Sequence, residues 1–251
     1  RMTSYETRYD VIVVGGGHAG AEAALAAARM GARTLLLTMN LDTIGQMSCN
    51  PAIGGLAKGH MVKEIDALGG EMARNTDATG IHFRQLNTKK GPAVRASRAQ
   101  ADKKDYQFRM KHVVESQELL DVKMGMVDDI VTSDAPRKRV DGVLTKTGML
   151  YHARSVVMTT GTFLRGLVHV GTFQQQAGRA GEGSAEHASK GLARLGFTMG
   201  RLKTGTPPRV NARSLDFIAM EPQPGDPLPR PFSFATAAIA QTQIDCYLAR
   251  T

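Results

Sequence analysis

The chain has 251 residues, of which 42% are hydrophobic, and it carries a formal net charge of +9 at pH 7. This length allows one large domain, or one domain and part of another, with a sizeable core. No apolar run is long enough to cross a bilayer and no signal-peptide pattern is present, so we expect a cytoplasmic protein without a membrane segment. The two cysteines, Cys49 and Cys246, exclude a disulfide framework.

A nucleotide-binding pattern opens the chain. Tyr9 to Val14 is rich in β-branched residues and predicts a buried parallel strand, and an Ala-rich helix is expected from Ala21 to Met30, with a second strand from Arg33 to Thr38. Between the first strand and the helix lies the sequence Gly15-Gly16-Gly17-His18-Ala19-Gly20. It fits G-x-G-x-x-G in the required place, which predicts that these residues bind a dinucleotide.

One part of this pattern is missing. An acidic residue is expected at the end of the second strand, where it would bind the adenosine ribose. Thr38-Met39-Asn40 stands there instead. Asn40 and Asp42 are the candidate substitutes, and the sequence leaves the choice between them open.

A cysteine-containing loop follows, with the sequence Ser48-Cys49-Asn50-Pro51-Ala52-Ile53-Gly54-Gly55. We expect it to lead into a helix over residues 58–72, whose N-terminus and backbone N–H groups would favour a thiolate. Cys49 is therefore a candidate nucleophile, and a buried structural thiol is the alternative. Cys246 lies in the sequence Ile244-Asp245-Cys246-Tyr247-Leu248, whose apolar residues alternate as in a strand, and it is expected in the core.

Basic residues are concentrated between Arg84 and Lys111, where nine Lys and Arg residues accompany only two Asp. A Gly/Pro turn at residues 87–98, flanked by cations, is expected to precede a helix from about Arg98 to Ser116. Cations near a helix N-terminus favour a phosphate, from a cofactor or from a nucleic acid. A solvated helix face is the alternative interpretation.

The remaining segments predict further α/β structure. Short stretches at 81–83, 122–126, 130–132, 140–146 and 149–153 have strand character and predict an antiparallel meander, after which residues 155–159 return as a buried strand. A Gly-rich loop at 178–184 is expected to precede a helix over 184–195. A cationic segment at 201–209 is expected to follow a strand. The Pro-rich stretch 220–231 indicates a linker or a crossing between domains, and the strand-like end at 241–251 indicates a truncated chain.

Several of these motifs together resemble the glucose-inhibited division protein A family of FAD-dependent tRNA uridine 5-carboxymethylaminomethyl modification enzymes. The resemblance is carried by residues 15–20, 46–55, 90–96, 161–164 and 200–209 and extends over essentially the whole chain. Family members are two to three times longer, which agrees with a truncated chain. Their second strand also ends without the acidic residue.

The resemblance implies a specific activity. Such enzymes bind FAD, form homodimers and work with a tRNA-modification GTPase, which gives a heterotetramer. They add an aminomethyl or carboxymethylaminomethyl group to C5 of the wobble uridine, with methylenetetrahydrofolate as carbon donor and NADH as reductant. The resemblance places most of the NADH site and a second functional cysteine beyond residue 251, so we expect this fragment to be inactive alone.

The resemblance also assigns roles to residues. It implies that Cys49 is catalytic, as a ring nucleophile or a proton-transfer partner, and that the backbone of Gly15 to Gly20 holds the FAD pyrophosphate. It implies cofactor contacts for Val127 and Ser184. Five cations are hypotheses for phosphate or tRNA contacts: Lys89, Lys90, Arg95, Lys203 and Arg209. No metal site is expected, because the histidines and cysteines lack ligand spacing.

The resulting fold prediction is α/β: a Rossmann-like FAD-binding domain over residues 1–205, with a parallel sheet and an inserted antiparallel meander, and the start of a second α/β insertion domain, associated with NADH, over 206–251. Two other functions remain open. One is another FAD oxidoreductase or a relative of the folate-dependent tRNA methyltransferases. The other is a non-catalytic scaffold that binds nucleotide and RNA.

Overall fold

The computed structural model describes residues 2–134, 136, 138–179 and 181–249. The chain forms two compact units: unit 1 comprises Arg1–Gly45 and Met110–Lys203, and unit 2 comprises Gln46–Arg109 and Thr204–Thr251. Ala180 of the expected Gly-rich loop and the last two residues of the chain lie outside the described residues. The predicted domain boundary at residue 205 stays a prediction.

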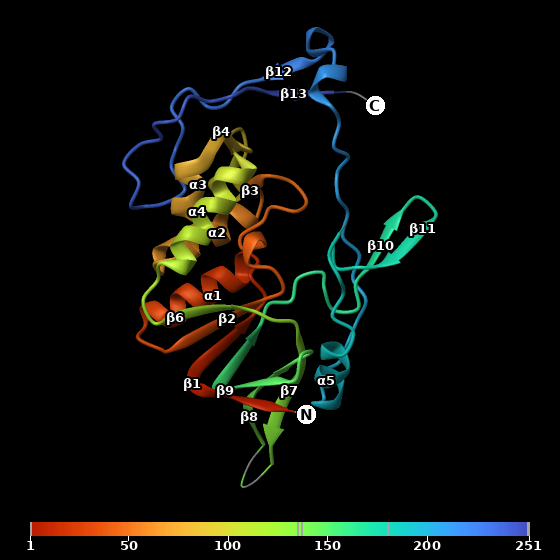
Figure 1. Cartoon of the computed structure of the whole chain (residues 1–251). Helices are drawn as coiled ribbons and strands as arrows, with labels where there is room; N and C mark the ends of the chain where they lie inside the picture. Colours follow the sequence, from red (N-terminus) through yellow and green to blue (C-terminus); the bar gives the residue numbers. More distant parts are fainter. Residues whose placement is uncertain (1, 135, 137, 180, 250–251) are drawn as a thin grey trace. The chain divides into compact units, whose positions relative to one another are not determined.

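Unit 1 is built on a six-stranded sheet of order β6-β2-β1-β9-β8-β7 (Figure 1). Its strands are β1 (Thr3–Val14), β2 (Thr34–Thr38), β6 (Leu120–Met124), β7 (Val127–Ser133), β8 (Arg139–Thr145) and β9 (Met149–Met158). The first four in spatial order are mutually parallel, and β9, β8 and β7 form an antiparallel meander. The predicted α/β fold, with a parallel sheet and a meander, is confirmed.

The meander differs in detail from the prediction. Residues 122–126 were expected within it, but β6 pairs in parallel with β2 at the sheet edge. Residues 149–153 and 155–159 were expected as two strands, and they form the single strand β9, because its first half pairs with β8 while its whole length follows β1. The second half of β9 is not buried as expected, since Val157 is 37% exposed.

Helix α1 (His18–Arg29) packs against β1 and β2. Its buried face consists of small residues and one leucine: Gly20, Ala21, Ala24, Leu25 and Ala28. Small side chains let a helix approach a sheet closely, and the apolar strands below it supply the core. Ile12, Leu35 and Leu36 are fully buried there. The Ala-rich sequence after the glycine loop thus fixes α1 on the sheet.

The rest of unit 1 follows β9. A hairpin of β10 (Leu167–Val170) and β11 (Phe173–Gln176) precedes the short helix α5 (Ala188–Arg194). The helix expected over 184–195 therefore begins four residues later, and Ser184 does not lie at its N-terminus. Residues 201–209 were expected to follow a strand, but the last regular element before them is α5.

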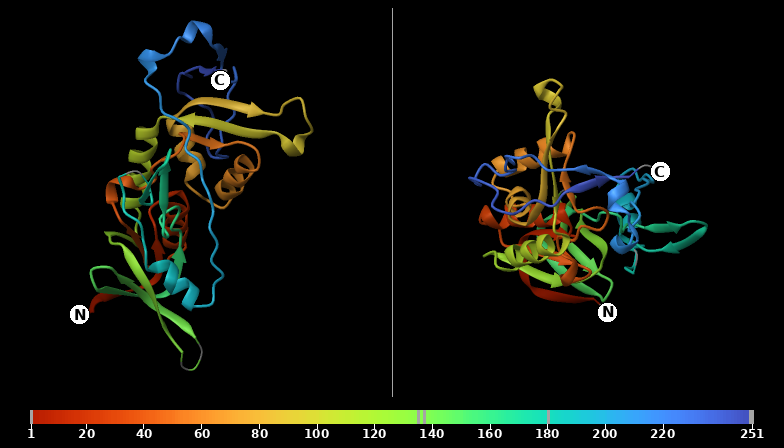
Figure 2. Two further views of the ribbon diagram at one scale, coloured as in Figure 1. Left: turned by 90° about the vertical axis from the view of Figure 1, so that its right-hand side faces the viewer. Right: turned by 90° about the horizontal axis from the view of Figure 1, so that it is seen from above.

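Unit 2 contains a three-stranded antiparallel sheet of order β3-β5-β4, formed by β3 (Ala52–Gly54), β5 (Ala96–Ala101) and β4 (Gly80–Leu86). Figure 2 shows β4 and β5 as a two-stranded ribbon that ends in a loop. Helices α2 (Lys58–Ala67) and α3 (Met72–Thr79) connect β3 with β4. Residues 58–72 were expected to form a helix that Gly69-Gly70 interrupts near its end, and α2 does end before these glycines, where Gly69 has a φ of +91°.

The helix expected from Arg98 to Ser116 is wrong in its first turn. Residues 96–101 are strand β5, because they pair with β3 on one side and β4 on the other. Helix α4 (Lys103–Glu115) begins after Asp102, whose carboxylate accepts hydrogen bonds from the backbone N–H groups of Lys104 and Asp105 at 2.8 and 3.0 Å. The basic loop at 87–95 therefore joins two strands and does not lead into a helix.

The C-terminal segment of unit 2 covers the edge strand β4. The backbone N–H of Phe83 donates to Gln243 Oε1 at 2.8 Å, and that of Gln85 donates to Asp226 Oδ2 at 2.8 Å. On either side of Asp226 and Gln243 in the sequence, β12 (Glu221–Gln223) and β13 (Cys246–Leu248) pair as a two-stranded antiparallel sheet. These side chains occupy the hydrogen-bonding groups that an edge strand leaves open. Among the described residues, no helix is both long and apolar enough to span a bilayer.

Candidate functional site

The glycine loop of unit 1 has the geometry that its pattern predicts. Gly15 has a φ of +107°, and a Cβ on it would lie 2.3 Å from the Thr159 carbonyl oxygen. A Cβ on Gly20 would lie 1.7 Å from the Gly15 carbonyl oxygen. A Cβ on Gly17 would meet no atom within 4 Å. Gly15 and Gly20 are thus needed for the turn and for close packing, while Gly17 leaves open space beside the N-terminus of α1, as a bound pyrophosphate requires.

Thr159 completes this loop. Its hydroxyl lies 2.8 Å from the Val14 carbonyl oxygen and 3.1 Å from the Gly15 carbonyl oxygen. Its backbone N–H donates a hydrogen bond to the same Val14 carbonyl oxygen at 2.9 Å. The hydroxyl's role in holding the loop was missed, because no local pattern shows that β9 lies beside β1.

The end of β2 provides no acidic side chain. Thr38 is buried, and the Asn40 side-chain oxygen accepts a hydrogen bond from the backbone N–H of Asp42 at 2.9 Å. Asn40 therefore begins a short 3-10 helix, Leu41–Thr43. The Asp42 carboxylate is exposed, and one of its oxygens lies 3.6 Å from Lys111 Nζ. Both candidate substitutes are exposed, and the Asn40 side chain is engaged in this local turn.

His18 and Ala19 are the first two residues of α1. Burial lowers the pKa of His18, and the guanidinium of Arg179 lowers it further. Arg179 is itself held by Glu182, with Nη2 to Oε2 at 2.8 Å. A neutral imidazole beside the glycine loop is the consequence, and no local pattern indicated that Arg179 would lie near it.

The two other expected cofactor residues are engaged within the protein. Val127 is 5% exposed and belongs to the apolar cluster of unit 1, so its side chain is packed inside the protein. The Ser184 hydroxyl accepts a hydrogen bond from Gly166 N at 2.8 Å and donates to Phe163 O at 3.1 Å. Cofactor contacts by Val127 and Ser184 stay predictions.

In unit 2, Cys49 is exposed. Its Sγ lies 3.2 Å from the Gly205 carbonyl oxygen, and its own carbonyl oxygen accepts a hydrogen bond from Arg209 Nη2 at 3.0 Å. The loop leads into β3 and reaches α2 only afterwards, so the expected direct approach to a helix N-terminus is wrong. The structure brings together Cys49, Gly205 and Arg209, although more than 150 residues separate Cys49 from the other two in sequence.

The five cations expected to bind phosphate or tRNA occupy different places. Lys89, Lys90 and Arg95 are exposed in the loop between β4 and β5. Arg209 is exposed and orders the Cys49 loop. Lys203 is exposed at the end of unit 1. The loop cations share one hairpin, and Lys203 belongs to a different unit.

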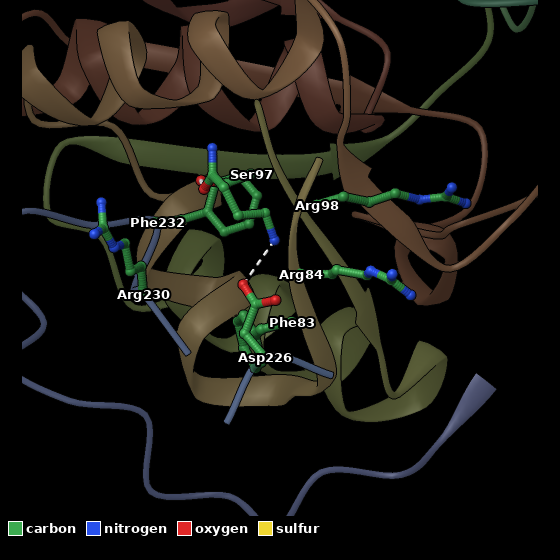
Figure 3. A pocket seen from close by; sticks show the side chains of 8 residues that line it. Phe83, Arg84, Ser97, Arg98, Asp226, Arg230 and Phe232 are labelled. Carbon is green, nitrogen blue, oxygen red and sulfur yellow. Dashed lines mark hydrogen bonds between the residues drawn. The ribbon is translucent and has the colours of Figure 1, made fainter. Parts of the chain in front are cut away.

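A small cavity of about 10 Å³ lies beside the base of the same hairpin (Figure 3). It is lined by Phe83, Arg84, Gln85, Ser97, Arg98, Asp226, Arg230 and Phe232. Its volume suffices for about one water molecule. Within the described part of the chain, no group of three or more His, Cys, Asp or Glu residues is placed to hold a metal ion.

Comparison with known proteins gives one consistent result. A family model described as "Glucose inhibited division protein A" matches residues 10–251. The tRNA uridine 5-carboxymethylaminomethyl modification enzyme MnmG of Geobacter sulfurreducens is 61% identical over 250 residues, which are 100% of this chain and 39% of that protein. The protein of the same name from Rhodopirellula baltica is 53% identical over 250 residues, 97% of this chain and 38% of that protein.

Solved structures of similar proteins belong to the same group. Aquifex aeolicus GidA in its form I crystal superimposes with a TM-score of 0.91 at 51% identity, covering 96% of this chain and 41% of that one. The GidA-related protein from Thermus thermophilus gives a TM-score of 0.55 at 25% identity, covering 76% and 69%. The chain thus spans about 40% of the length of the curated relatives it matches.

Proposed function

The chain belongs to the glucose inhibited division protein A family, and we propose that the protein carrying it is an FAD-dependent enzyme that modifies the wobble uridine of tRNA. The observation that carries this proposal is the joint presence, within the family match, of a correctly formed glycine loop and an exposed Cys49. The names of the 61% and 53% identical relatives supply the substrate class.

The residues present fit a bound FAD. The open space at Gly17 and the N-terminus of α1 would receive the pyrophosphate, and the neutral His18 adds no charge next to it. The backbone of Val127 and the loop around Ser184 are the further proposed contacts. When bound, the flavin supplies redox chemistry, while the protein supplies placement and charge.

Cys49 is the proposed catalytic residue. Its thiolate would add to the uracil ring and make C5 nucleophilic, or the thiol would transfer a proton. The exposure of Cys49 meets the first requirement for either role, because the ring must reach the sulfur. Arg209 and Gly205 act on it as positioning groups, since both hydrogen-bond the Cys49 residue itself.

The finer parts of the proposal concern the whole protein. It would act as a homodimer with a GTPase partner, and would attach an aminomethyl or carboxymethylaminomethyl group using methylenetetrahydrofolate and NADH. Lys89, Lys90, Arg95, Lys203 and Arg209 are proposed tRNA contacts, supported by their exposure and positive charge.

The test is nucleoside analysis of tRNA from cells that lack this activity and express the whole protein. We expect the modified wobble uridine to be restored, and restoration to require a bound flavin. Flavin binding without any change in tRNA nucleosides would instead favour another FAD oxidoreductase.

A further inference from the structure

Two arginines face each other across the β4–β5 ribbon of unit 2. Arg84 and Arg98 are direct partners in the antiparallel register, so their side chains stand on the same face of the sheet. Figure 3 shows both guanidinium groups extending in the same direction, away from Phe232 and Arg230. Both residues are partly exposed. This places two positive charges side by side at the surface.

The charge of this pair is not compensated by an ion pair. Among the described residues, neither Arg84 nor Arg98 makes a salt bridge. Asp226 lines the neighbouring cavity, but its Oδ2 accepts the backbone N–H of Gln85 at 2.8 Å. Arg230 adds a third cation to the lining of that cavity. Like charges directly opposite in a sheet are destabilising, so the fold retains an unfavourable pair.

Arg98 pairs on its other side with Gly54 of β3. The place of a Cβ on Gly54 is already taken by the Ser97 carbonyl oxygen and the Phe232 ring, 2.2 and 2.7 Å away. Cys246 of β13 lies close enough to feel both arginines: burial raises the pKa of its thiol, Arg98 lowers it, the Asp245 carboxylate raises it and Arg84 lowers it. Because the cavity beneath has room for only about one water molecule, a ligand of the two arginines would bind on the outer face.

We propose that Arg84 and Arg98 together bind a phosphate group of the RNA substrate. Two adjacent guanidinium groups offer the planar, multidentate donors that suit a phosphate, and a bound phosphate would neutralise their mutual repulsion. RNA is favoured over a small phosphate because the same ribbon continues into Lys89, Lys90 and Arg95, which extends the positive charge along its length. This inference rests on the proposed function and adds two residues to its substrate contacts.

The test measures tRNA affinity of the flavin-loaded whole protein as a function of salt. Arg84→Gln and Arg98→Gln are each expected to weaken binding and to reduce the slope of log K against log salt by about one. Arg139→Gln, the same charge change at the exposed first residue of β8, is the matched control and is expected to leave slope and affinity unchanged. Arg84→Lys keeps the charge and is expected to restore the slope while recovering only part of the affinity.

A second readout separates RNA from free phosphate. Alkylation of Cys246, followed by peptide mass spectrometry, is expected to slow when tRNA is added and to be little affected by inorganic phosphate at millimolar concentration. Protection by inorganic phosphate, with tRNA affinity unchanged in both Gln variants, would overturn the assignment to RNA. Wild-type affinity and slope in both variants, with no protection of Cys246, would overturn the site itself. If tRNA binds as expected but is not modified, the proposed function fails and this site stands.

Discussion

At the scale of single residues, the glycines of the loop have different roles: some are required by the fold, and one leaves room for a ligand. A Cβ on Gly15 would collide with the Thr159 carbonyl oxygen, and a Cβ on Gly20 would collide with the Gly15 carbonyl oxygen. The fold itself therefore requires glycine at both positions. Gly17 has an ordinary φ of −75° and open space around it. The fold therefore does not require glycine at position 17, and the open space there is available to a ligand.

This difference gives a prediction about cofactor binding. Gly17→Ala is expected to leave the thermal unfolding temperature of the apoprotein unchanged but to lower flavin content per chain, because the methyl group would occupy the open space. Gly20→Ala, the matched variant, is expected to destabilise the protein by about 3 kcal/mol through overpacking. The measurements are flavin absorbance and calorimetry. Full flavin content in Gly17→Ala would contradict a pyrophosphate site at this loop.

His18 gives a prediction about pH. Its pKa is lowered in the folded state, by burial first and by Arg179 second, so below its ordinary value of 6.5 the unfolded chain binds the proton more readily. Stability is therefore expected to fall as the pH drops from 6.5 through the folded-state pKa. His18→Gln is expected to reduce this loss in denaturant titrations at several pH values. An identical pH dependence in both proteins would rule His18 out as its source.

At the scale of elements, the helices of unit 2 hold its C-terminal segment in place. Asp77 of α3 accepts hydrogen bonds from the backbone N–H groups of Phe232 and Ser233, each at 2.8 Å. Asp66 of α2 accepts one from Phe234 at 2.8 Å, and Lys63 Nζ donates to the Pro231 and Phe232 carbonyl oxygens. Burial raises the pKa of Asp77, while these N–H groups oppose that rise. Two helices thus fix a segment that has little regular structure.

Removing this anchor should release the segment. Asp77→Ala is expected to lower the free energy of unfolding by about 3 kcal/mol, because two buried N–H groups lose a charged acceptor. It is also expected to speed hydrogen exchange at Phe232 and Ser233. Glu64→Ala, on the exposed face of α2, is the control and should change neither quantity. Unchanged exchange in Asp77→Ala would show that the segment is held by other contacts.

At the scale of the whole molecule, the sequence predicted the local elements best where a pattern is self-contained. β1, the glycine loop, α1 and β2 form such a unit, since their periodicity and glycines are consecutive. The prediction failed where a residue's state depends on distant partners. Residues 96–101 have an alanine-rich sequence that suits a helix, but pairing with the two neighbouring strands makes them β5.

The candidate site shows the same division. The sequence alone identified Cys49 and the basic segment from Arg84 to Lys111 as chemically notable. It did not indicate that Gly205 and Arg209 contact Cys49, or that Arg84 and Arg98 face each other, because these contacts are set by tertiary pairing. The fold prediction is confirmed, and the roles of the site residues stay predictions that the variants above address.

The central claim is that Cys49 performs chemistry in a flavin-dependent tRNA-modifying enzyme. The most direct measurement is mass spectrometry of the wobble uridine after incubation of tRNA with the whole protein, the proposed GTPase partner, methylenetetrahydrofolate and NADH. Cys49→Ser is expected to keep the flavin and the unfolding temperature of the wild type and to lose the modification. Full modification by Cys49→Ser with flavin bound would contradict the account.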